Sequence, residues 1–536
     1  TNDCVVIGDI ERTRLDNIKV MFFVGINDGN VPKKADSRSV LSESDREYLE
    51  DKGIVMSASV REKAFTQRFY LYLIMTKSAE KLYMSYAVKN SEGAALIPSY
   101  IIRSMRKMFS HCLKLSYKDT AQQNSYVTIP RAANSFDNTE IAANVDEDII
   151  DSLTGGRLVG SVTSFENFAE CPLRYYLRYG VDLKEREEFT FSPVNFGVVL
   201  HAVIREVCDE IKKNGESYYL ISEEKRREMV KRSVAAITDI YQNSILKDSS
   251  RNSFMIKRME DLADRTVWAM GEQLKCGDFV PFVFEHKFNM EVGDGDRKQL
   301  MSGTIDRVDI CENGTDVYVR IIDYKTGKKD FNIVKTYYGI DIQLMVYMEA
   351  AMKLVAKMRP GKNVIPAGVF YYNISDPIVS ATTESAEEIE DKIKGELRLK
   401  GMVNSDKDIA EKMDNTEGTS LNIPVSRKAD GGFDSRRSKV MNTEQFNMLG
   451  RFVDVRAIDT ADRIVGGDIR RSPYKDGQFS SCDRCPYGAV CGFSVDLPGC
   501  NYRKLKKFDD EVLWNNIKEG VDENGKKMDT GAEERD

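Results

Sequence analysis

The chain has 536 residues, of which 41% are hydrophobic and 30% charged, and this length predicts two or three domains rather than one hydrophobic core. Its 78 Lys and Arg residues against 85 Asp and Glu residues give a net charge of -7, which excludes a nonspecific polycation but leaves room for a local basic groove that binds nucleic acid. Without a signal-peptide pattern or the roughly 18 uninterrupted apolar residues of a membrane helix, the sequence predicts a cytoplasmic protein with no membrane partner, in which the ten cysteines are reduced.

The amino-terminal residues predict a small α/β segment. Residues 17–25, "NIKVMFFVG", are typical of a buried strand, and the following "INDGNVP" is typical of a polar turn. A helix is predicted from residue 61, and it runs into a short strand before residue 86. Polar segments then lead to the acidic stretch "NVDEDIIDSL", so we expect a linker over residues 111–155.

A change of pattern at about residue 156 indicates a larger second domain, which we expect to extend to residue 515. The spacing Thr163-x-x-Glu166 predicts a capping box at the start of a helix that ends near Cys171. The remaining elements are predicted as two helical stretches, a set of strands, a helix, a strand and a charged helical region, over residues 196–211, 220–275, 282–324, 340–358, 367–374 and about 385–465. The charged residues 516–536 predict a disordered tail.

The segment "GTIDRVDICENGTDVYVRIIDYKTG" predicts a hairpin that carries two carboxylates. The Asn-Gly pair at 313–314 between two strand patterns is a strong signal for a two-residue turn. With that turn Asp306 lies opposite Ile321, and Asp323 and Lys325 share the face of Asp306 because side chains alternate along a strand. Like charges on one face are costly unless a cation lies between them, and Mg²⁺ prefers carboxylate oxygens. The hairpin therefore predicts a metal site.

A solvated hairpin face is the alternative interpretation of these acids. Asp306 would then pair with Arg307 or Lys325 in water, without a metal. Both acids, however, end the apolar strand patterns "GTID" and "VRIID", where an unpaired carboxylate is expensive. This position favours the metal site.

Three pieces of sequence resemble motifs of the RecB-type nuclease family with the P-D-(D/E)-x-K fold. "GTIDRVD" matches its G-x-I-D-R motif, "IIDYKTG" its D-Y-K motif and "QLMVY" its Q-x-x-x-Y motif. The resemblance implies that Asp306 and Asp323 bind Mg²⁺ or Mn²⁺, and that Lys325 orients the attacking water and stabilises developing charge. It also implies that Gln343 and Tyr347, one helical turn apart, face the site.

The resemblance further implies a fold class and a third ligand. The fold would be α/β, with a restriction-endonuclease-like core in which helices flank a mixed sheet, and with helical insertions. A lone helical histidine is more often a packed or capping residue, but the family has a metal-binding histidine in the setting of "GVVLH", which implies His201 as a ligand. Glu285, in "VFEHKF", matches a family acid more loosely, and a surface salt-bridge residue is an equal alternative.

The segment "SCDRCPYGAVCGF" carries three closely spaced cysteines, whereas a sulfur site needs four ligands. The three are Cys482, Cys485 and Cys491, in a C-x2-C-x5-C arrangement. From spacing alone the fourth is either Cys500, which is near in sequence, or Cys171, which ends the capped helix. "AECPLRYYLRYG" together with "CDRCPYGAVCGF" resembles the split pattern of family nucleases whose four thiolates hold a 4Fe-4S cluster, which implies Cys171. Zinc at the same four positions is the alternative, and either group would be structural.

Residues 1–110 resemble part of a superfamily 1 helicase motor. "VMFFVGINDGNVP" and "RFYLYLIMTKSAEKLYMSY" are similar to its late elements, with Lys77 where the motor has an arginine. No G-x-x-x-x-G-K-[ST] motif occurs in the sequence, so we expect no ATPase activity from this chain alone. We therefore expect a degenerate or truncated helicase-like segment before the nuclease domain.

The order of helicase-like segment, nuclease and split cysteine site resembles the C-terminal part of the B subunit of AddAB-type helicase-nucleases. These bacterial complexes resect double-strand breaks for recombinational repair. The resemblance implies a heterodimer in which an A subunit unwinds DNA, while this chain is an exonuclease that cuts the emerging single strand, the 5′-ended one by the family's assignment.

Two other functions stay open on the sequence. The first is a catalytically inert nuclease fold that serves as a scaffold for DNA or a partner, and the second is a standalone Cas4-like exonuclease. The set of Asp306, Asp323 and Lys325 argues against the scaffold, because a scaffold has no need of mutually repelling acids. The helicase-like segment argues against the standalone nuclease.

Overall fold

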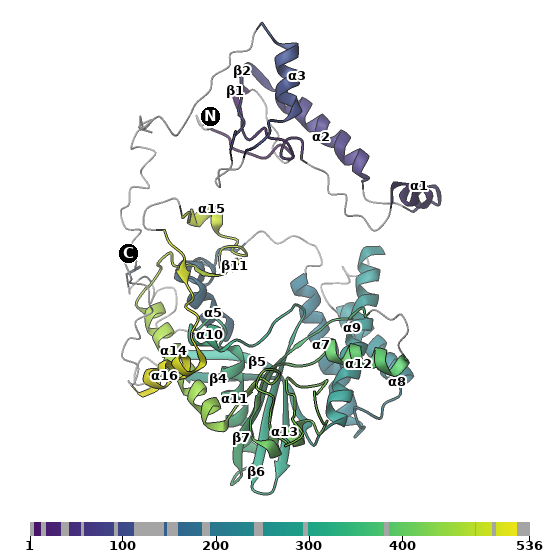
Figure 1. Cartoon of the computed structure of the whole chain (residues 1–536), viewed down its shortest axis with the longest axis vertical. Coiled ribbons are helices and arrows are strands. Elements are labelled where there is room, and N and C mark those ends of the chain that lie inside the picture. The colour runs from purple at the N-terminus through teal and green to yellow at the C-terminus, as the bar shows by residue number, and fades with distance from the viewer. Residues whose placement is uncertain are drawn as a thin grey trace. The chain divides into compact units, whose positions relative to one another are not determined.

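The computed structural model of the chain divides into two compact units, Thr1–Asn134 and Ser135–Asp536 (Figure 1). The structure describes residues 5–11, 18–33, 42–54, 58–89, 95–111, 144–146, 149, 159–184, 193–240, 250–292, 299–379, 385–477, 479–495 and 500–522. The boundary between the units falls in the predicted linker 111–155, most of which lies outside the described residues. Among the helices that the structure describes, none is long and apolar enough to cross a membrane.

The first unit is built on a parallel pair of strands, β1 (Ile18–Phe23) and β2 (Ser78–Met84). Its helices are α1 (Glu43–Asp51), α2 (Val60–Met75) and α3 (Tyr100–Met108). Helix α2 begins at a capping box in which Ser59 and Glu62 exchange hydrogen bonds with each other's backbone. The strand within 17–25 and the helix that runs into a strand before residue 86 agree with the sequence prediction. The predicted burial of that strand is wrong, because Met21 is the only buried residue of β1 and Phe22 is exposed.

The second unit is built on a mixed seven-stranded sheet. Its strands are β3 (Val159–Ser161), β4 (Val280–Val292), β5 (Gln299–Asn313), β6 (Asp316–Lys325), β7 (Asn363–Asn373), β8 (Lys400–Asn404) and β9 (Val440–Met441). The order is β3-β5-β6-β7-β8-β9, with β4 also paired to β5. Strands β4, β5 and β6 run antiparallel to one another in that series, whereas β7 is parallel to β6. The predicted mixed sheet is confirmed.

Helices cover both faces of this sheet (Figure 1). The helices are α5 (Val162–Glu170), α6 (Pro172–Tyr175), the π-helical turn η1 (Tyr176–Gly180), α7 (Pro193–Lys213), α8 (Glu223–Ile240), α9 (Ser250–Lys275), α10 (Ile333–Tyr337), α11 (Gln343–Met358), α12 (Ala386–Glu396), α13 (Lys407–Met413), α14 (Thr443–Val465), α15 (Gly488–Cys491) and α16 (Asp510–Asp522). A small sheet joins β10 (Tyr474–Asp476) to β11 (Phe479–Ser480) and β12 (Arg503–Lys504). Alternate residues of β6 enter two hydrophobic cores. Val317 and Val319 pack in the core that includes α5, α11 and α14. Tyr318 and Ile322 pack in the core that includes α7, α8 and α9.

The β5–β6 hairpin turns one residue later than the sequence predicts. Asn313 pairs with Asp316, so the two-residue loop is Gly314 and Thr315 rather than Asn313 and Gly314. Gly314 has φ of 60° and takes the first loop position, where a type II′ turn requires positive φ. The predicted pairing of Asp306 with Ile321 is therefore wrong, since Ile321 pairs with Val308. The pairing register shifts by two residues, which preserves the face of every side chain, so the predicted convergence of the acids is unaffected.

The predicted capping box at the start of α5 is also wrong. Ser161 is the N-cap, and its hydroxyl accepts a hydrogen bond from the backbone N–H of Ser164 at 3.1 Å. Glu166 instead accepts from the backbone of α11. A serine two residues earlier competes for the cap, and tertiary contact decides where the glutamate goes. The helix does end at Cys171, as expected.

The predicted disordered tail begins too early. Residues 516–522 belong to α16, whose Leu513 and Ile517 are buried in the core that includes α14. With Val521, these side chains form an i, i+4, i+8 stripe, and burial of that stripe stabilises the helix. Residues 523–536 lie outside the described part of the chain.

A pair of acids, Glu349 of α11 and Asp454 of α14, lies where these helices border a cavity of about 660 Å³, which is the size of a small-ligand pocket. Burial raises the pKa of Asp454 to about 8, and a hydrogen bond with Glu349 adds to the rise, whereas Lys353 opposes it. Since an aspartate in an unfolded chain titrates near pH 3.9, the folded chain binds more protons between about pH 4 and pH 8. The stability due to the protonated acid is present below about pH 4 and is lost as the pH rises through 8.

Replacing Asp454 by asparagine should therefore stabilise the protein more at pH 8 than at pH 5. The expected gain at pH 8 is on the order of 1 kcal/mol, because asparagine keeps a hydrogen bond without a charge. Thermal unfolding at the two pH values measures the difference. Asp459→Asn, in the same helix but paired with Arg463 at 3.7 Å, is the control and should show no such gain. An equal shift at both pH values for Asp454→Asn would contradict the prediction.

Candidate active site

Two buried carboxylates meet where β5 and β6 separate. Because Arg307 pairs with Ile322, the next step in register sets Asp306 across from Asp323. Asp306 is 7% exposed and Asp323 is 2% exposed. Oδ2 of Asp306 accepts a hydrogen bond from the backbone N–H of Tyr324 at 2.6 Å. Burial raises the pKa of Asp323 to about 7, and the charge of Asp306 contributes to this rise.

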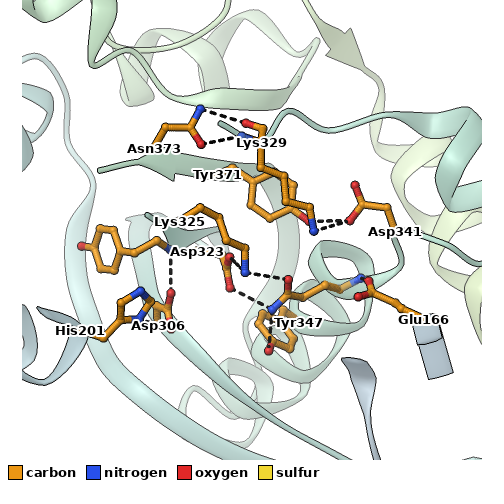
Figure 2. Close-up of polar contacts among 12 residues, drawn as sticks. Glu166, His201, Asp306, Asp323, Lys325, Lys329, Asp341, Tyr347, Tyr371 and Asn373 are labelled. Carbon is orange, nitrogen blue, oxygen red and sulfur yellow. Dashed lines mark hydrogen bonds and ion pairs between the residues drawn. The ribbon is translucent and has the colours of Figure 1, made fainter. Parts of the chain in front are cut away.

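A histidine and a second acid lie beside Asp306. Nδ1 of His201 lies 3.4 Å from Oδ1 of Asp306 and 3.7 Å from Oε1 of Glu285. One ligand atom from each of the three residues lies within 4.8 Å of the others, and no other such group of His, Cys, Asp or Glu occurs among the described residues. Figure 2 shows His201 and Asp306 directed toward each other. Burial lowers the pKa of His201, but the two carboxylates outweigh it and raise that pKa to about 10.

Glu285 reaches this group through an unusual backbone conformation. Its neighbours Phe284 and His286 pair with Arg307 and Ile305, so Glu285 lies across from Asp306 in β4. Its φ is 47°, in the left-handed region that non-glycine residues rarely occupy within a strand. Such strain persists only where the surrounding structure imposes it, and it is concentrated at functional sites. Glu285 is partly buried and its ion pair is with His201 of this group, which favours the metal-binding acid over a surface salt-bridge residue.

Lys325, Gln343 and Tyr347 form a hydrogen-bonded chain around Asp323. Figure 2 shows Lys325 and Tyr347 on either side of this carboxylate. Nζ of Lys325 lies 2.5 Å from Oδ2 of Asp323 and donates to Oε1 of Gln343 at 3.0 Å. Nε2 of Gln343 donates to Oδ1 of Asp323 at 3.1 Å and to the hydroxyl oxygen of Tyr347 at 3.0 Å. Helix α11 thus presents residues i and i+4 to the end of β6. All the residues predicted from the three motifs are brought together.

The residue after Asp306 belongs to a different cluster on the opposite face of β5. Arg307 donates two hydrogen bonds of 2.7 Å to Asp309, and Arg320 donates one of 2.8 Å to the same carboxylate. These three side chains are at most 1% exposed. The solvated hairpin face is therefore wrong as an interpretation, because Asp306 and Asp323 are buried and Arg307 pairs with Asp309.

The donor set near Asp306 fits a hard divalent cation. Three carboxylates and an imidazole supply oxygen and nitrogen ligands of the kind that Mg²⁺ and Mn²⁺ accept. Asp323 lies next to this group but is paired with Lys325, so the closely spaced donors are His201, Glu285 and Asp306. Because a ligating imidazole must be neutral, a bound cation would take the place of the proton on His201.

A second polar cluster beside the first escaped the sequence analysis. Asp341 accepts a hydrogen bond of 2.7 Å from the hydroxyl of Tyr371 and lies 3.0 Å from Nζ of Lys329. Asn373 holds the Lys329 backbone through two hydrogen bonds of 3.0 Å. Glu166 lies below Asp341 in Figure 2, on the side of the cluster away from Asn373. The only signal in the sequence was the position of Asp341, two residues before the Q-x-x-x-Y motif.

The four cysteines of the split pattern lie close enough together to affect one another's pKa. Cys171 lies between α5 and α6, Cys482 and Cys485 lie in the turn after β11, and Cys491 ends α15. Burial raises the pKa of the Cys482 thiol, and Cys171, Cys485 and Cys491 each add to that rise. Cys171 and Cys485 likewise raise the pKa of Cys491, after burial. The structure thus brings Cys171 to the three clustered cysteines across the whole second unit.

Known proteins match both the second unit and the chain as a whole. Residues 160–492, from β3 to the end of the cysteine segment, match the family model of the PD-(D/E)XK nuclease superfamily. The chain is 32% identical over 99% of its length to the B subunit of the ATP-dependent helicase/deoxyribonuclease of Lachnoclostridium phytofermentans. It is 31% identical over 98% of its length to the protein of that name from Clostridium acetobutylicum, and 30% identical over 97% to that from Clostridium botulinum. The chain covers 50% of each relative, so it spans about half their length.

Proposed function

The chain belongs to the PD-(D/E)XK nuclease superfamily, and from this we propose that it is a divalent-metal-dependent deoxyribonuclease that degrades single-stranded DNA. The observation that carries the proposal is the pair of buried acids, Asp306 and Asp323. Lys325 binds both Asp323 and Gln343, the first residue of α11. Burial of two acids side by side is costly without a cation, so the arrangement supports a catalytic rather than a structural purpose.

The residues divide into metal ligands and charge-stabilising groups. Asp306, His201 and Asp323 would hold the ion, with Glu285 as a further oxygen ligand. A divalent ion held by these residues would supply Lewis-acid chemistry, namely activation of water and withdrawal of charge from the scissile phosphate. The Lys325 ammonium stabilises the negative charge that develops on the phosphate during in-line attack.

Gln343 and Tyr347 keep the Lys325 ammonium in position. Gln343 accepts from Lys325 and donates to Asp323, so its amide fixes the distance between the two charges. Tyr347 accepts from the same amide and prevents it from turning away. Burial raises the pKa of Tyr347 well above its usual value, so its hydroxyl stays neutral and does not serve as a base.

The proposed setting is a helicase-nuclease complex. The relatives are named as the B subunit of an enzyme that has both activities. We assign residues 1–110 to a helicase-like segment without ATPase activity of its own, 111–155 to a linker and 156–515 to the nuclease. A partner A subunit would unwind the duplex in the bacterial cytoplasm, and this chain would cut the 5′-ended strand during double-strand break repair.

The four neighbouring cysteines would hold a structural 4Fe-4S cluster. In a tetrahedral zinc site, Zn–S bonds of about 2.3 Å place the sulfurs about 3.8 Å apart. No three of Cys171, Cys482, Cys485 and Cys491 have sulfurs within 4.8 Å of one another, although all four lie in the described part of the chain. The wider spacing supports a larger inorganic core over a single zinc ion, and such clusters are held by four thiolates.

Hydrolysis of labelled single-stranded DNA tests the proposal. The chain, alone and with its A subunit, is incubated with Mg²⁺ and single strands labelled at the 5′ or the 3′ end. Short products that require Mg²⁺ and disappear with a chelator are expected, and the label released first reports the polarity. If the wild-type protein binds single-stranded DNA but never cleaves it, the inert scaffold is the correct function.

A further inference from the structure

Glu166 caps a helix to which it does not belong. Its Oε1 accepts hydrogen bonds from the backbone N–H groups of Ile342 at 3.0 Å and Gln343 at 3.1 Å. These are among the first amides of α11, which have no carbonyl partner within their own helix. Ile342 is the N-cap residue of α11 and makes no side-chain capping bond. The carboxylate therefore replaces a local cap, at the helix end where negative charge is favoured.

Glu166 is not the cap of its own helix. Ser161 is the N-cap of α5, so the Glu166 carboxylate is left to cap α11. Burial raises the pKa of Glu166 to about 7, while Lys329 opposes the rise and Asp341 adds to it. The hydrogen bonds from the first amides of α11 help to offset the cost of burying this carboxylate. The first residue of the helix that it holds, Gln343, is the one that links Lys325 to Asp323.

Helix α5 contacts the chain before α11 at a second point. A Cβ added at Gly339 would lie 3.4 Å from the Cβ of Ala169, so the two backbones approach closely there. Ala169 follows Glu166 by three residues and lies on the same face of α5. Two residues later the helix ends at Cys171, one of the four neighbouring cysteines. One rigid helix thus joins the cysteine site to the start of α11.

We propose that Glu166 is a positioning residue for Gln343, and that α5 transmits the state of the cysteine site to the active site. The proposal rests on the proposed nuclease function for its catalytic consequence, but not for its structural one. The hydrogen bonds of Glu166 go to the backbone of Ile342 and Gln343 and not to a proposed metal ligand, so its removal misplaces the Lys325–Gln343 pair without removing a ligand.

Glu166→Ala and Glu166→Gln in the full chain test the positioning role by two readouts. The first is hydrogen exchange over residues 340–347, without metal or DNA, where Glu166→Ala should accelerate exchange by about tenfold or more because the two amides that donate to Glu166 lose their acceptor. The second is nuclease activity, where kcat should fall between about tenfold and a hundredfold while KM changes little. Glu166→Gln keeps an acceptor oxygen and should restore most of both.

Glu170→Gln is the matched control on the same helix. Glu170 pairs with Arg174 rather than with α11, so this variant should leave exchange over 340–347 unchanged. Unchanged exchange in Glu166→Ala would overturn the positioning role. If the wild-type protein proves inactive on DNA, the exchange result still stands, so failure of the proposed function is distinguishable from failure of this inference.

Loss of the cysteine site tests the transmission through α5. In Cys171→Ser, exchange over 340–347 should accelerate as in Glu166→Ala, whereas exchange over β7 should not. If Cys171→Ser unfolds the domain, Cys485→Ser, whose side chain is half-exposed, provides the comparison. A cysteine variant that loses its metal but keeps wild-type exchange over 340–347 would overturn the coupling.

Discussion

Asp306→Asn is expected to lower the rate of single-stranded DNA hydrolysis by about a thousandfold or more, since the metal contributes several kcal/mol to the stability of the transition state. Asp306 is the acid nearest to His201, and the amide of asparagine cannot supply the charge that a divalent cation requires. Single-turnover cleavage of a labelled oligonucleotide at saturating Mg²⁺ measures the loss. Isothermal titration should show a matching fall in Mg²⁺ or Mn²⁺ affinity.

The same variant should fold normally. Asparagine has the shape of aspartate and can still accept from the Tyr324 N–H, and the lost attraction to His201 is offset by the lost repulsion of Asp323, so the melting temperature of metal-free Asp306→Asn should stay close to that of the wild type. Asp316→Asn is the matched control, because Asp316 lies at the far end of the same hairpin, where it accepts from Asn363 at 3.1 Å. It should retain full activity. Wild-type cleavage by folded Asp306→Asn would show that the active site lies elsewhere.

Cys171→Ser is expected to abolish binding of the proposed iron–sulfur cluster and to lower the melting temperature on the order of 10 °C. The loss of stability follows because Cys171 belongs to the start of the second unit and the other three cysteines to its end, so the bound cluster removes conformational freedom from a long intervening chain. Iron content and the visible absorption spectrum of anaerobically purified protein, together with thermal unfolding, measure both effects.

Cys500→Ser is the control that separates the two candidate fourth ligands. Cys500 is buried like Cys171 and lies nearer in sequence to the other three cysteines, so loss of a buried thiol is matched between the variants. We expect Cys500→Ser to bind as much iron as the wild type. Iron lost from Cys500→Ser but retained by Cys171→Ser would reverse the assignment, and colourless wild-type protein containing zinc would replace the cluster by zinc.

The hairpin shows how far sequence alone predicts the site. Alternation of side chains along a strand is insensitive to a register error of two, so Asp306, Asp323 and Lys325 were placed on one face although the turn was misplaced. The turn is misplaced because an Asn-Gly pair predicts that both residues lie in the loop. In the structure Asn313 ends the strand, and Gly314 takes the positive φ of the first loop position. Local periodicity likewise predicted α7, whereas the roles of His201 and Gln343 were implied by the resemblance to the nuclease family and not by the pattern of apolar residues.

Contacts between distant segments could not be predicted in this way. Glu166 and Gln343 are far apart in sequence, and nothing near Glu166 shows that its partner is a helix N-terminus rather than its own cap. The local pattern favoured a capping box because serine, threonine and glutamate at those spacings usually cap their own helix. The short strands β8 and β9 escaped prediction for a related reason, because their pairing depends on the sheet already built.

The left-handed backbone of Glu285 bears on any engineering of this chain for stability. A glycine there would relieve about 1 kcal/mol of strain, so a screen for heat resistance can select it. The same change deletes a carboxylate from the group around His201. Thermal tolerance and cation affinity would then move in opposite directions at a single position, so a library ranked by melting temperature alone would enrich nucleases that need more magnesium.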